Sequence, residues 1–135
     1  MAEDNIRLEI VTPEGQVFHQ MVEWFYVPSQ LGPTGILIGH APLVTALVPG
    51  LLRLRREGRE EFMVVGDGFL EMRDNEAEIL VHNAEIVEEI DVERALAARE
   101  RAQKRLAEHQ EDLDALRAEA ALARANARLS AKGII

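Results

Sequence analysis

Apolar and polar residues alternate along much of the first ninety residues, at the period of two that is typical of half-buried β-strands. Residues 6–11 show the first such alternation. Residues 22–27 hold the densest aromatic cluster and predict a central strand that stops at Pro28. Turn-forming Gly, Pro, Asp and Asn residues divide the segment into eight or more short strands at intervals of roughly 8–12 residues. This spacing is typical of a β-sandwich or a flattened barrel.

The glycines and prolines of this segment also predict its connections. Residues 30–35 are rich in both and predict a loop, which is followed by a short buried strand over residues 36–38. Residues 39–43 predict a tight loop that contains His40, a residue suited to shaping the loop or making a contact rather than to acting as a base. Residues 85–87 predict a last short strand.

The pattern changes at Asp91, after which alanine, leucine, arginine and glutamate follow helical spacing. It predicts a first helix over residues 92–106 or 92–107, a turn over 108–112 and a second helix over 112–131. Asp91 can cap the first helix by accepting a backbone N–H, and Gly133 can end the second after a basic turn. The chain is therefore predicted to be α+β.

The predicted order is an N-terminal antiparallel β-sandwich, residues 1–88, followed by a C-terminal antiparallel two-helix hairpin, residues 89–135. Apolar spacing predicts the faces on which the helices meet. On the first helix these positions are Val92, Ala95 or Leu96, Ala98, Ala102 and Leu106. On the second they are Leu113, Leu116, Ala120, Ala123 and Ala127. Alanines bury little area at about 25 cal/mol per Å², so the hairpin is predicted to be weakly packed and movable.

Composition narrows the classes of function. At 135 residues, the chain fits one domain or a small domain with an appendage, and its net charge of −9 argues against a general nucleic-acid binder. It has no cysteine, which excludes disulfides, cysteine nucleophiles and thiolate metal sites. No apolar run approaches the ~18 residues that span a bilayer, and the acidic first residues resemble neither a secretory signal nor a transit peptide.

Motifs for catalysis, metals or nucleotides of the usual kinds are absent from the sequence. Neither phosphate-loop nor dinucleotide glycine spacing occurs, and the four histidines are scattered without a pair at metal-ligand spacing. No serine, histidine and aspartate arrangement stands out either. We therefore expect no catalytic residue and no metal site.

The charges are unevenly distributed along the chain. Residues 1–90 hold 16 acids and 6 bases, whereas residues 91–135 hold 8 acids and 9 bases. Arginines of the two predicted helices repeat at intervals of seven and four residues, as Arg94, Arg101 and Arg105 and then as Arg117, Arg124 and Arg128. Each set lies on one face of its helix.

No acid follows Glu119, so the last turns carry Arg124, Arg128 and Lys132 at four-residue intervals. Like charges at this spacing repel one another. The cluster favours an anionic partner, either a phosphate ligand or an acidic protein surface. The alternative is a solvated helix face with ion pairs within each helix. Glu100 and Lys104 on the first helix have the spacing of such a pair.

The motifs of the whole chain, in order and spacing, resemble the epsilon subunits of F-type ATP synthases. The resemblance is carried by these segments: residues 11–15 (VTPEG), 35–37 (GIL), 39–43 (GHAPL), 49–50 (PG), 68–71 (GFLE) and 90–95 (IDVERA). The chain departs from many relatives in residues 30–34, which lack acids, and in residues 66–69, which read GDGF instead of the more usual SGGF.

The resemblance implies a non-catalytic subunit of the rotor's central stalk that needs no cofactor. The sandwich would bind the gamma subunit and the ring of membrane c subunits, with contacts at Leu31, Gly32, His40 and Pro42. The hairpin would fold on itself or extend into the alpha/beta catalytic hexamer and inhibit ATP hydrolysis. The complex would lie at the cytoplasmic face of a bacterial plasma membrane, with this subunit peripheral to it.

Some bacterial members bind ATP on the folded hairpin, and the resemblance implies the same regulatory ligand here. The residues that match their motif are Glu85, Ile90, Asp91, Arg94, Ala95, Arg101, Arg124 and Arg128. One alternative keeps the rotor role without ATP, with the arginines docking only on acidic surfaces of the catalytic subunits. A further alternative is an unrelated sandwich with a coiled-coil interaction arm, and a free-standing enzyme is the least supported.

Overall fold

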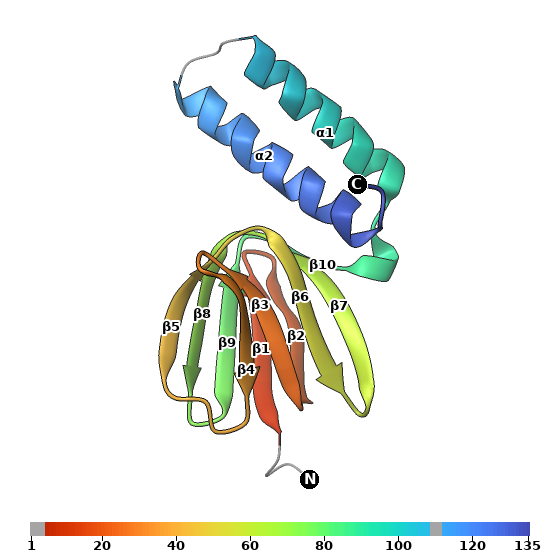
Figure 1. Cartoon of the computed structure of the whole chain (residues 1–135). Helices are drawn as coiled ribbons and strands as arrows, with labels where there is room; N and C mark the ends of the chain where they lie inside the picture. The colour runs from red at the N-terminus through yellow and green to blue at the C-terminus, as the bar shows by residue number, and fades with distance from the viewer. Residues whose placement is uncertain (1–4, 109–111) are drawn as a thin grey trace. The chain divides into compact units, whose positions relative to one another are not determined.

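The computed structural model describes residues 5–108 and 112–135, without the side chains of residues 112 and 113. The chain divides into two compact units between Glu85 and Ile86. The first unit is built of strands and the second of helices (Figure 1). The α+β prediction, with a sandwich followed by two helices, is confirmed. No described helix is both long and apolar enough to span a membrane.

The described residues form ten strands, all within the first unit except for Ile86, the last residue of the tenth. They are β1 (Ile6–Thr12), β2 (Gly15–Val22), β3 (Trp24–Ser29), β4 (Gly32–Leu37), β5 (Leu43–Leu47), β6 (Gly50–Arg56), β7 (Arg59–Val65), β8 (Gly68–Arg73), β9 (Glu76–Val81) and β10 (Ala84–Ile86). The neighbours run β10-β7-β6-β3-β5-β8-β9-β1-β2, and β4 pairs with the other edge of β3 along its full length. β1 and β9 pair in parallel, whereas β1–β2, β3–β4, β5–β8, β6–β7 and β8–β9 pair antiparallel.

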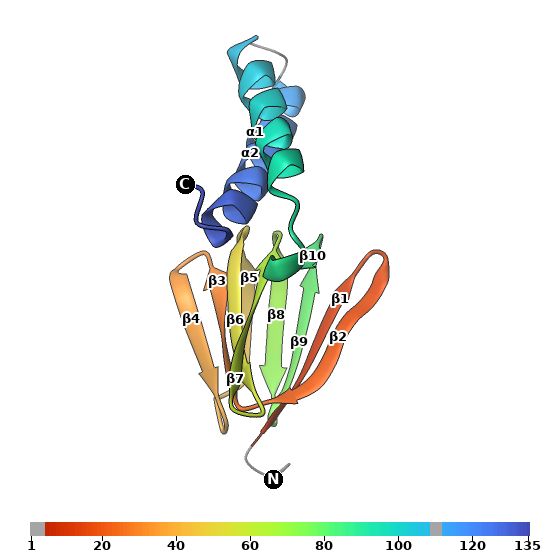
Figure 2. The same cartoon turned by 90° about the vertical axis from the view of Figure 1, so that its right-hand side faces the viewer.

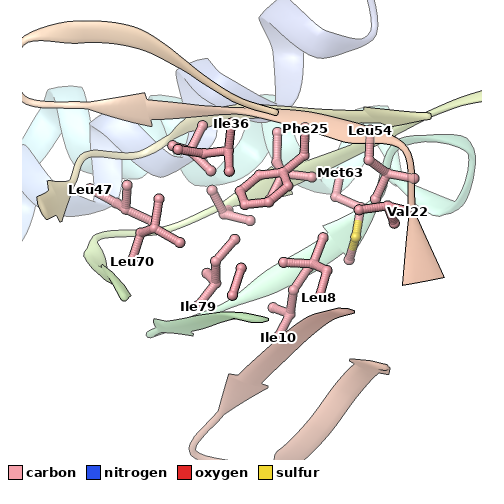
Figure 3. Close-up of a cluster of buried hydrophobic side chains, with 14 of the residues drawn as sticks. Leu8, Ile10, Val22, Phe25, Ile36, Leu47, Leu54, Met63, Leu70 and Ile79 are labelled. Atoms are coloured by element: carbon pink, nitrogen blue, oxygen red, sulfur yellow. The ribbon is translucent and has the colours of Figure 1, made fainter. Parts of the chain in front are cut away.

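Two layers of strands face each other around one core. The layers meet where β3 passes to β5, through the pairing of Ser29 with Leu47. Alternate residues of both layers point inward, so aliphatic side chains fill the space between them, with Phe25 as the aromatic member (Figure 3). The fully buried members with the largest side chains include Leu8, Ile36 and Ile79. This core lies wholly within the first unit.

The sequence prediction was wrong about where β3 ends and where β4 begins. Pro28 does not stop β3, because its carbonyl oxygen accepts a hydrogen bond from the N–H of Val48 at 2.8 Å. Residues 32–35 are not a loop but the first four residues of β4, which pairs with β3 in register from Gly32 to Leu37. A Cβ on Gly35 would lie 2.7 Å from the ring of Tyr26, so this glycine permits close packing between strands rather than a turn.

The second unit holds the helices α1 (Val92–Ala107) and α2 (Asp112–Ala131), which run antiparallel and pack on each other (Figures 1 and 2). Both fall on their predicted ranges. The short strand predicted over residues 85–87 is β10, followed by a 3-10 turn over Val87–Glu89. Residues 109–111 of the predicted inter-helix turn lie outside the described residues.

The end of α2 is a Schellman motif. The N–H of Gly133 donates to the carbonyl of Ser130 at 3.0 Å, and the N–H of Ile134 donates to the carbonyl of Leu129 at 2.9 Å. Gly133 has a φ of +77°, which explains why glycine occupies this position. The predicted glycine cap of this helix is confirmed.

The face of α2 that packs was predicted wrongly. The buried residues are Ala118, Ala125 and Leu129, whereas Leu116 is 62% exposed and Ala120 is exposed too. At 100° per residue the buried stripe lies about half a turn from the predicted one. Alanines occur on several faces of this helix, so the apolar period alone does not determine which face packs. On α1, the buried Ala95 and Ala102 lie on the predicted stripe.

Candidate functional site

The start of α1 is fixed by Asp91. Its Oδ1 accepts a hydrogen bond from the backbone N–H of Arg94 at 3.1 Å, which satisfies one donor of the first turn. Just before it, the N–H of Ile90 donates to the carbonyl of Val87 and the Ile90 side chain is 6% exposed. The predicted N-cap is confirmed, and it holds the Asp91 carboxylate close to the backbone from which the Arg94 side chain projects.

Three of the expected nucleotide-binding residues follow along α1. Ala95 is buried in the packed face, while Arg94 and Arg101 are exposed. The two arginines are seven residues apart, so they lie on one face of the helix but about 10 Å apart along its axis. The structure therefore places Arg94 at the beginning of α1 and Arg101 two turns further on.

The other two expected arginines belong to the end of α2. Arg124 and Arg128 are half-buried and one turn apart. Because the helices are antiparallel, this end of α2 lies beside the beginning of α1. The Nζ of Lys132 confirms the juxtaposition, because it donates to the carbonyl of Glu88 at 3.3 Å. This contact was not predicted from the sequence, since no local pattern pairs residues 44 positions apart.

The arginine stripes of the two helices lie on the same broad side of the hairpin. On each helix the arginine comes one residue before a packed position: Arg94 before Ala95 on α1, and Arg124 before Ala125 on α2. Two antiparallel helices that pack through matching stripes are related by an approximate two-fold axis. Residues that precede a packed position by one therefore lie on the same broad face of the hairpin in both helices. Arg94, Arg124 and Arg128 consequently gather at one end of one face.

Such a group of guanidinium groups suits a phosphate chain, because each offers planar, forked donors that match phosphate oxygens. Glu85, the remaining expected residue, lies on β10 in the other unit and is half-buried. Ile90, Asp91, Arg94, Ala95, Arg124 and Arg128 belong to the end of the hairpin where α1 begins and α2 ends, and Arg101 lies two turns further along α1.

The four residues expected to contact partner subunits lie in two places. Leu31, which is 96% exposed, and Gly32 lie at the start of β4, where the hydroxyl of Ser29 accepts the N–H of Leu31. His40 and Pro42 lie in the loop between β4 and β5. A six-residue strand separates the two places by roughly 20 Å, at about 3.3 Å per residue.

The loop around His40 is held by a residue that the sequence analysis did not single out. The side-chain oxygen of Asn75 accepts the N–H of Gly39 at 2.7 Å, and the carbonyl of Asn75 accepts the N–H of Arg7 at 2.9 Å. Asn75 lies in the β8–β9 turn with a φ of +60°, a region that asparagine tolerates better than most residues. The turn signal at this position was visible in the sequence, but its contact with the His40 loop was not.

Comparison with known proteins identifies two matching family models that together cover nearly all of the chain. The model described as "ATP synthase, Delta/Epsilon chain, beta-sandwich domain" matches residues 5–87. The model described as "ATP synthase, Delta/Epsilon chain, long alpha-helix domain" matches residues 88–133.

Individual relatives agree with the family models. The chain is 49% identical over 107 residues to the ATP synthase epsilon chain of Pelotomaculum thermopropionicum, covering 79% of this chain and 80% of the relative. It is 45% identical over 101 residues to the ATP synthase epsilon chain of Bacillus subtilis, covering 75% and 76%.

Solved structures are similar as well. A chain in the structure of Euglena gracilis mitochondrial ATP synthase, OSCP/F1/c-ring, superposes with a TM-score of 0.83 at 25% identity, covering 96% of this chain and 82% of that one. A chain from the central stalk/c-ring of Tetrahymena thermophila mitochondrial ATP synthase gives a TM-score of 0.61 at 14% identity, with 96% of each chain covered. This second similarity concerns the fold alone.

Proposed function

The chain belongs to the ATP synthase delta/epsilon chain family, and from this premise we propose that it is a non-catalytic rotor subunit with a nucleotide-sensitive hairpin. The sandwich binds the gamma subunit and the c-subunit ring. The hairpin alternates between a folded form, which ATP stabilises, and an extended form, which reaches the alpha/beta hexamer and inhibits ATP hydrolysis. The subunit is peripheral to the membrane, at the cytoplasmic face of a bacterial plasma membrane.

The two ends of β4 support contact with two different partners. Leu31 presents an almost fully exposed leucine at one end, and the His40 loop is ordered by Asn75 at the other. A single small contact would not span the roughly 20 Å between them. We therefore assign the two ends to two partners, the gamma subunit and the c ring, without choosing which end takes which.

The composition of the hairpin supports a conformational switch. Its packed positions are mostly alanines, including Ala95, Ala102, Ala118 and Ala125, so the contact between α1 and α2 buries little area for its length. A ligand at a hundred times its dissociation constant stabilises the state it binds by about 2.7 kcal/mol. That free energy suffices to shift the population of a weakly packed hairpin between two forms.

One observation carries the proposal that the ligand is ATP. The cap at Asp91 and the antiparallel packing bring Arg94 from α1 and Arg124 and Arg128 from α2 to one end of one face. Arginines drawn from two helices would be bridged by a phosphate chain, which would link α1 to α2. The bound ligand would therefore favour the folded hairpin over the extended one.

Equilibrium titration of the full chain with ATP tests this proposal. We expect saturable ATP binding near Asp91, which Arg94→Ala weakens at least tenfold. Arg59→Ala, which removes an exposed arginine from the sandwich, serves as the matched control and should bind ATP like the unmodified chain. Absence of saturable binding up to millimolar ATP, in all three proteins, would remove the nucleotide from the mechanism.

A second candidate keeps the inhibitory hairpin but not the ligand. The exposure of Arg94, Arg101, Arg105 and Arg117 favours it, because exposed arginines on one face also suit an acidic protein surface. Truncation of the chain after Glu89 in the reconstituted complex should then raise ATP hydrolysis, whether or not the isolated chain binds ATP. Unchanged hydrolysis would contradict an inhibitory role for the hairpin.

A further inference from the structure

The two helices carry the same sequence pattern. Residues 90–106 (IDVERALAARERAQKRL) reappear 23 positions later as residues 113–129 (LDALRAEAALARANARL), and nine of the 17 positions are identical. Two of the differences are conservative, Ile90 to Leu113 and Gln103 to Asn126. Glu85 and Glu108, which precede the two copies, are also 23 positions apart.

The structure turns this repeat into an approximate two-fold symmetry. Identical alanines occupy the packed positions of both helices, Ala95 with Ala118 and Ala102 with Ala125, and all four are at most 3% exposed. The antiparallel arrangement then brings the first half of each repeat beside the second half of the other. Any group of residues at one end of the hairpin consequently has a counterpart at the other end.

The residues expected to bind ATP all have such counterparts. Each expected residue has a counterpart 23 positions away in the other copy of the repeat. The counterparts are Glu108, Leu113, Asp114, Arg117, Ala118, Arg124, Arg101 and Arg105. Arg101 and Arg124 exchange with each other. The remaining members form a second set that lies entirely within the helical unit.

Positions along the helix axes separate the six arginines into two trios. At about 1.5 Å per residue, Arg105, Arg117 and Arg101 lie at about 3, 8 and 9 Å from the helix ends that adjoin the turn. Arg124, Arg94 and Arg128 lie at about 18, 20 and 24 Å from the same ends. Arg101 is therefore level with Arg117, and far from Arg94.

The trio near the turn is accessible. Arg101, Arg105 and Arg117 are all exposed, and within the described residues no carboxylate oxygen lies within 4 Å of their side-chain nitrogens. Arg101 and Arg105 are one turn apart, where like charges repel each other. Asp114 precedes Arg117 by three residues, as Asp91 precedes Arg94, although Asp114 lies inside α2 rather than capping it.

We propose that Arg101, Arg105 and Arg117 form a second oligophosphate-binding site, symmetric to the one that contains Arg94, Arg124 and Arg128. The ligand is a di- or triphosphate chain, free or as part of a nucleotide. It would bridge α1 and α2 near the turn, so that the two ends of the folded hairpin would be stabilised separately. This inference rests on the proposed function, because the second site is defined by its correspondence to the first.

Titration of the full chain with inorganic tripolyphosphate at low ionic strength tests the proposal, with the arginine side-chain N–H resonances as the readout. Two saturable sites are expected in the unmodified chain. Arg117→Gln should weaken the site near the turn at least tenfold and leave the other unchanged, and the matched variant Arg94→Gln should do the reverse. Glutamine retains helix propensity, and circular dichroism checks that each variant keeps its helices.

The same titration with ATP distinguishes the source of the phosphate chain. Tighter binding of ATP than of tripolyphosphate near the turn identifies a nucleotide as the ligand, and equal binding identifies the phosphate chain alone. A single site that Arg94→Gln removes and Arg117→Gln leaves intact overturns the second site but preserves the proposed function. A single site with the opposite behaviour overturns the proposed function. Binding of neither ligand overturns both and leaves an acidic protein surface as the partner of these arginines.

Discussion

Gly68 is required for the close approach of β8 to β9. A Cβ at this position would lie 1.9 Å from the carbonyl oxygen of Leu80 and 2.8 Å from the Cα of Val81, both backbone atoms that cannot move without breaking the pairing. Gly68→Ala should therefore lower the free energy of unfolding of the sandwich by more than about 2 kcal/mol, at the upper end of ordinary substitutions. Urea unfolding, monitored by the fluorescence of Trp24, measures this loss.

Gly133→Ala provides the contrast. The position has a φ of +77° and no atom within 4 Å of an added Cβ, so the cost is backbone strain alone, about 1 kcal/mol. That cost falls on the helical unit. Equal losses at the two glycines would contradict the distinction between a steric clash and backbone strain.

Two substitutions of Asp91 separate the contribution of its capping hydrogen bond from that of its charge. Asp91→Ala removes the acceptor of the Arg94 N–H and should reduce helical stability by about 1 kcal/mol. Asp91→Asn keeps an acceptor oxygen and should cost less than half as much. Thermal unfolding followed at 222 nm compares the two variants, and an Asn variant as unstable as the Ala variant would mean that charge, not hydrogen bonding, fixes the helix start.

Residues with local signals were predictable from the sequence, and residues with distant partners were not. Asp91 and Gly133 act on backbone groups a few positions away, so their types and places suffice to predict the two helix ends. Asn75 and Lys132 instead bind backbone atoms 36 and 44 positions away. Their contacts depend on the fold as a whole, and the sequence pattern around each gives no sign of the partner.

At the scale of elements, the packed face of α2 offers the sharpest test. Ala125 is 0% exposed, whereas Ala120 belongs to the stripe predicted from the apolar period and is exposed. Ala125→Leu should overpack the hairpin and destabilise it by about 1–3 kcal/mol. Ala120→Leu should change its stability by less than about 0.5 kcal/mol, as surface substitutions do. Thermal unfolding of the helices measures both changes in stability. A larger loss in Ala120→Leu than in Ala125→Leu would mean that the face predicted from the apolar period is the packed one.

The errors in predicting elements have a common physical origin. In α2 the alanines give little contrast between faces, and leucines occur on both: Leu129 on the packed face, Leu113 and Leu116 on the predicted one. In β4, Pro33 and Gly35 resemble loop residues but lie in a strand that pairs only with β3, where missing donors and missing side chains are tolerated. Strands and helices with strong apolar contrast, such as β1 and α1, were predicted correctly.

At the scale of the whole molecule, the two units differ in what holds them together. Large aliphatic side chains such as Leu8, Leu54 and Ile79 are fully buried in the sandwich. The buried positions of the helical unit are mostly alanines, with Ile90 and Leu129 as the larger exceptions. At about 25 cal/mol per Å² of apolar area, the sandwich gains far more from each buried side chain. Local opening should therefore begin in the helices.

Native-state hydrogen exchange of the full chain tests this difference and connects it to function. Amides of α1 and α2 should exchange through openings that cost less free energy than those of β1 and β9, at the centre of one layer. Saturating ATP should slow exchange in the helices and leave the sandwich core unchanged, since a ligand bridging Arg94 and Arg124 stabilises only the closed hairpin. At the same ATP concentration, exchange in the helices should slow less in Arg94→Ala, which lacks one side of that bridge. Equal opening free energies in both units would mean that the alanine-lined contact is as strong as the sandwich core and is unsuited to a switch of this kind.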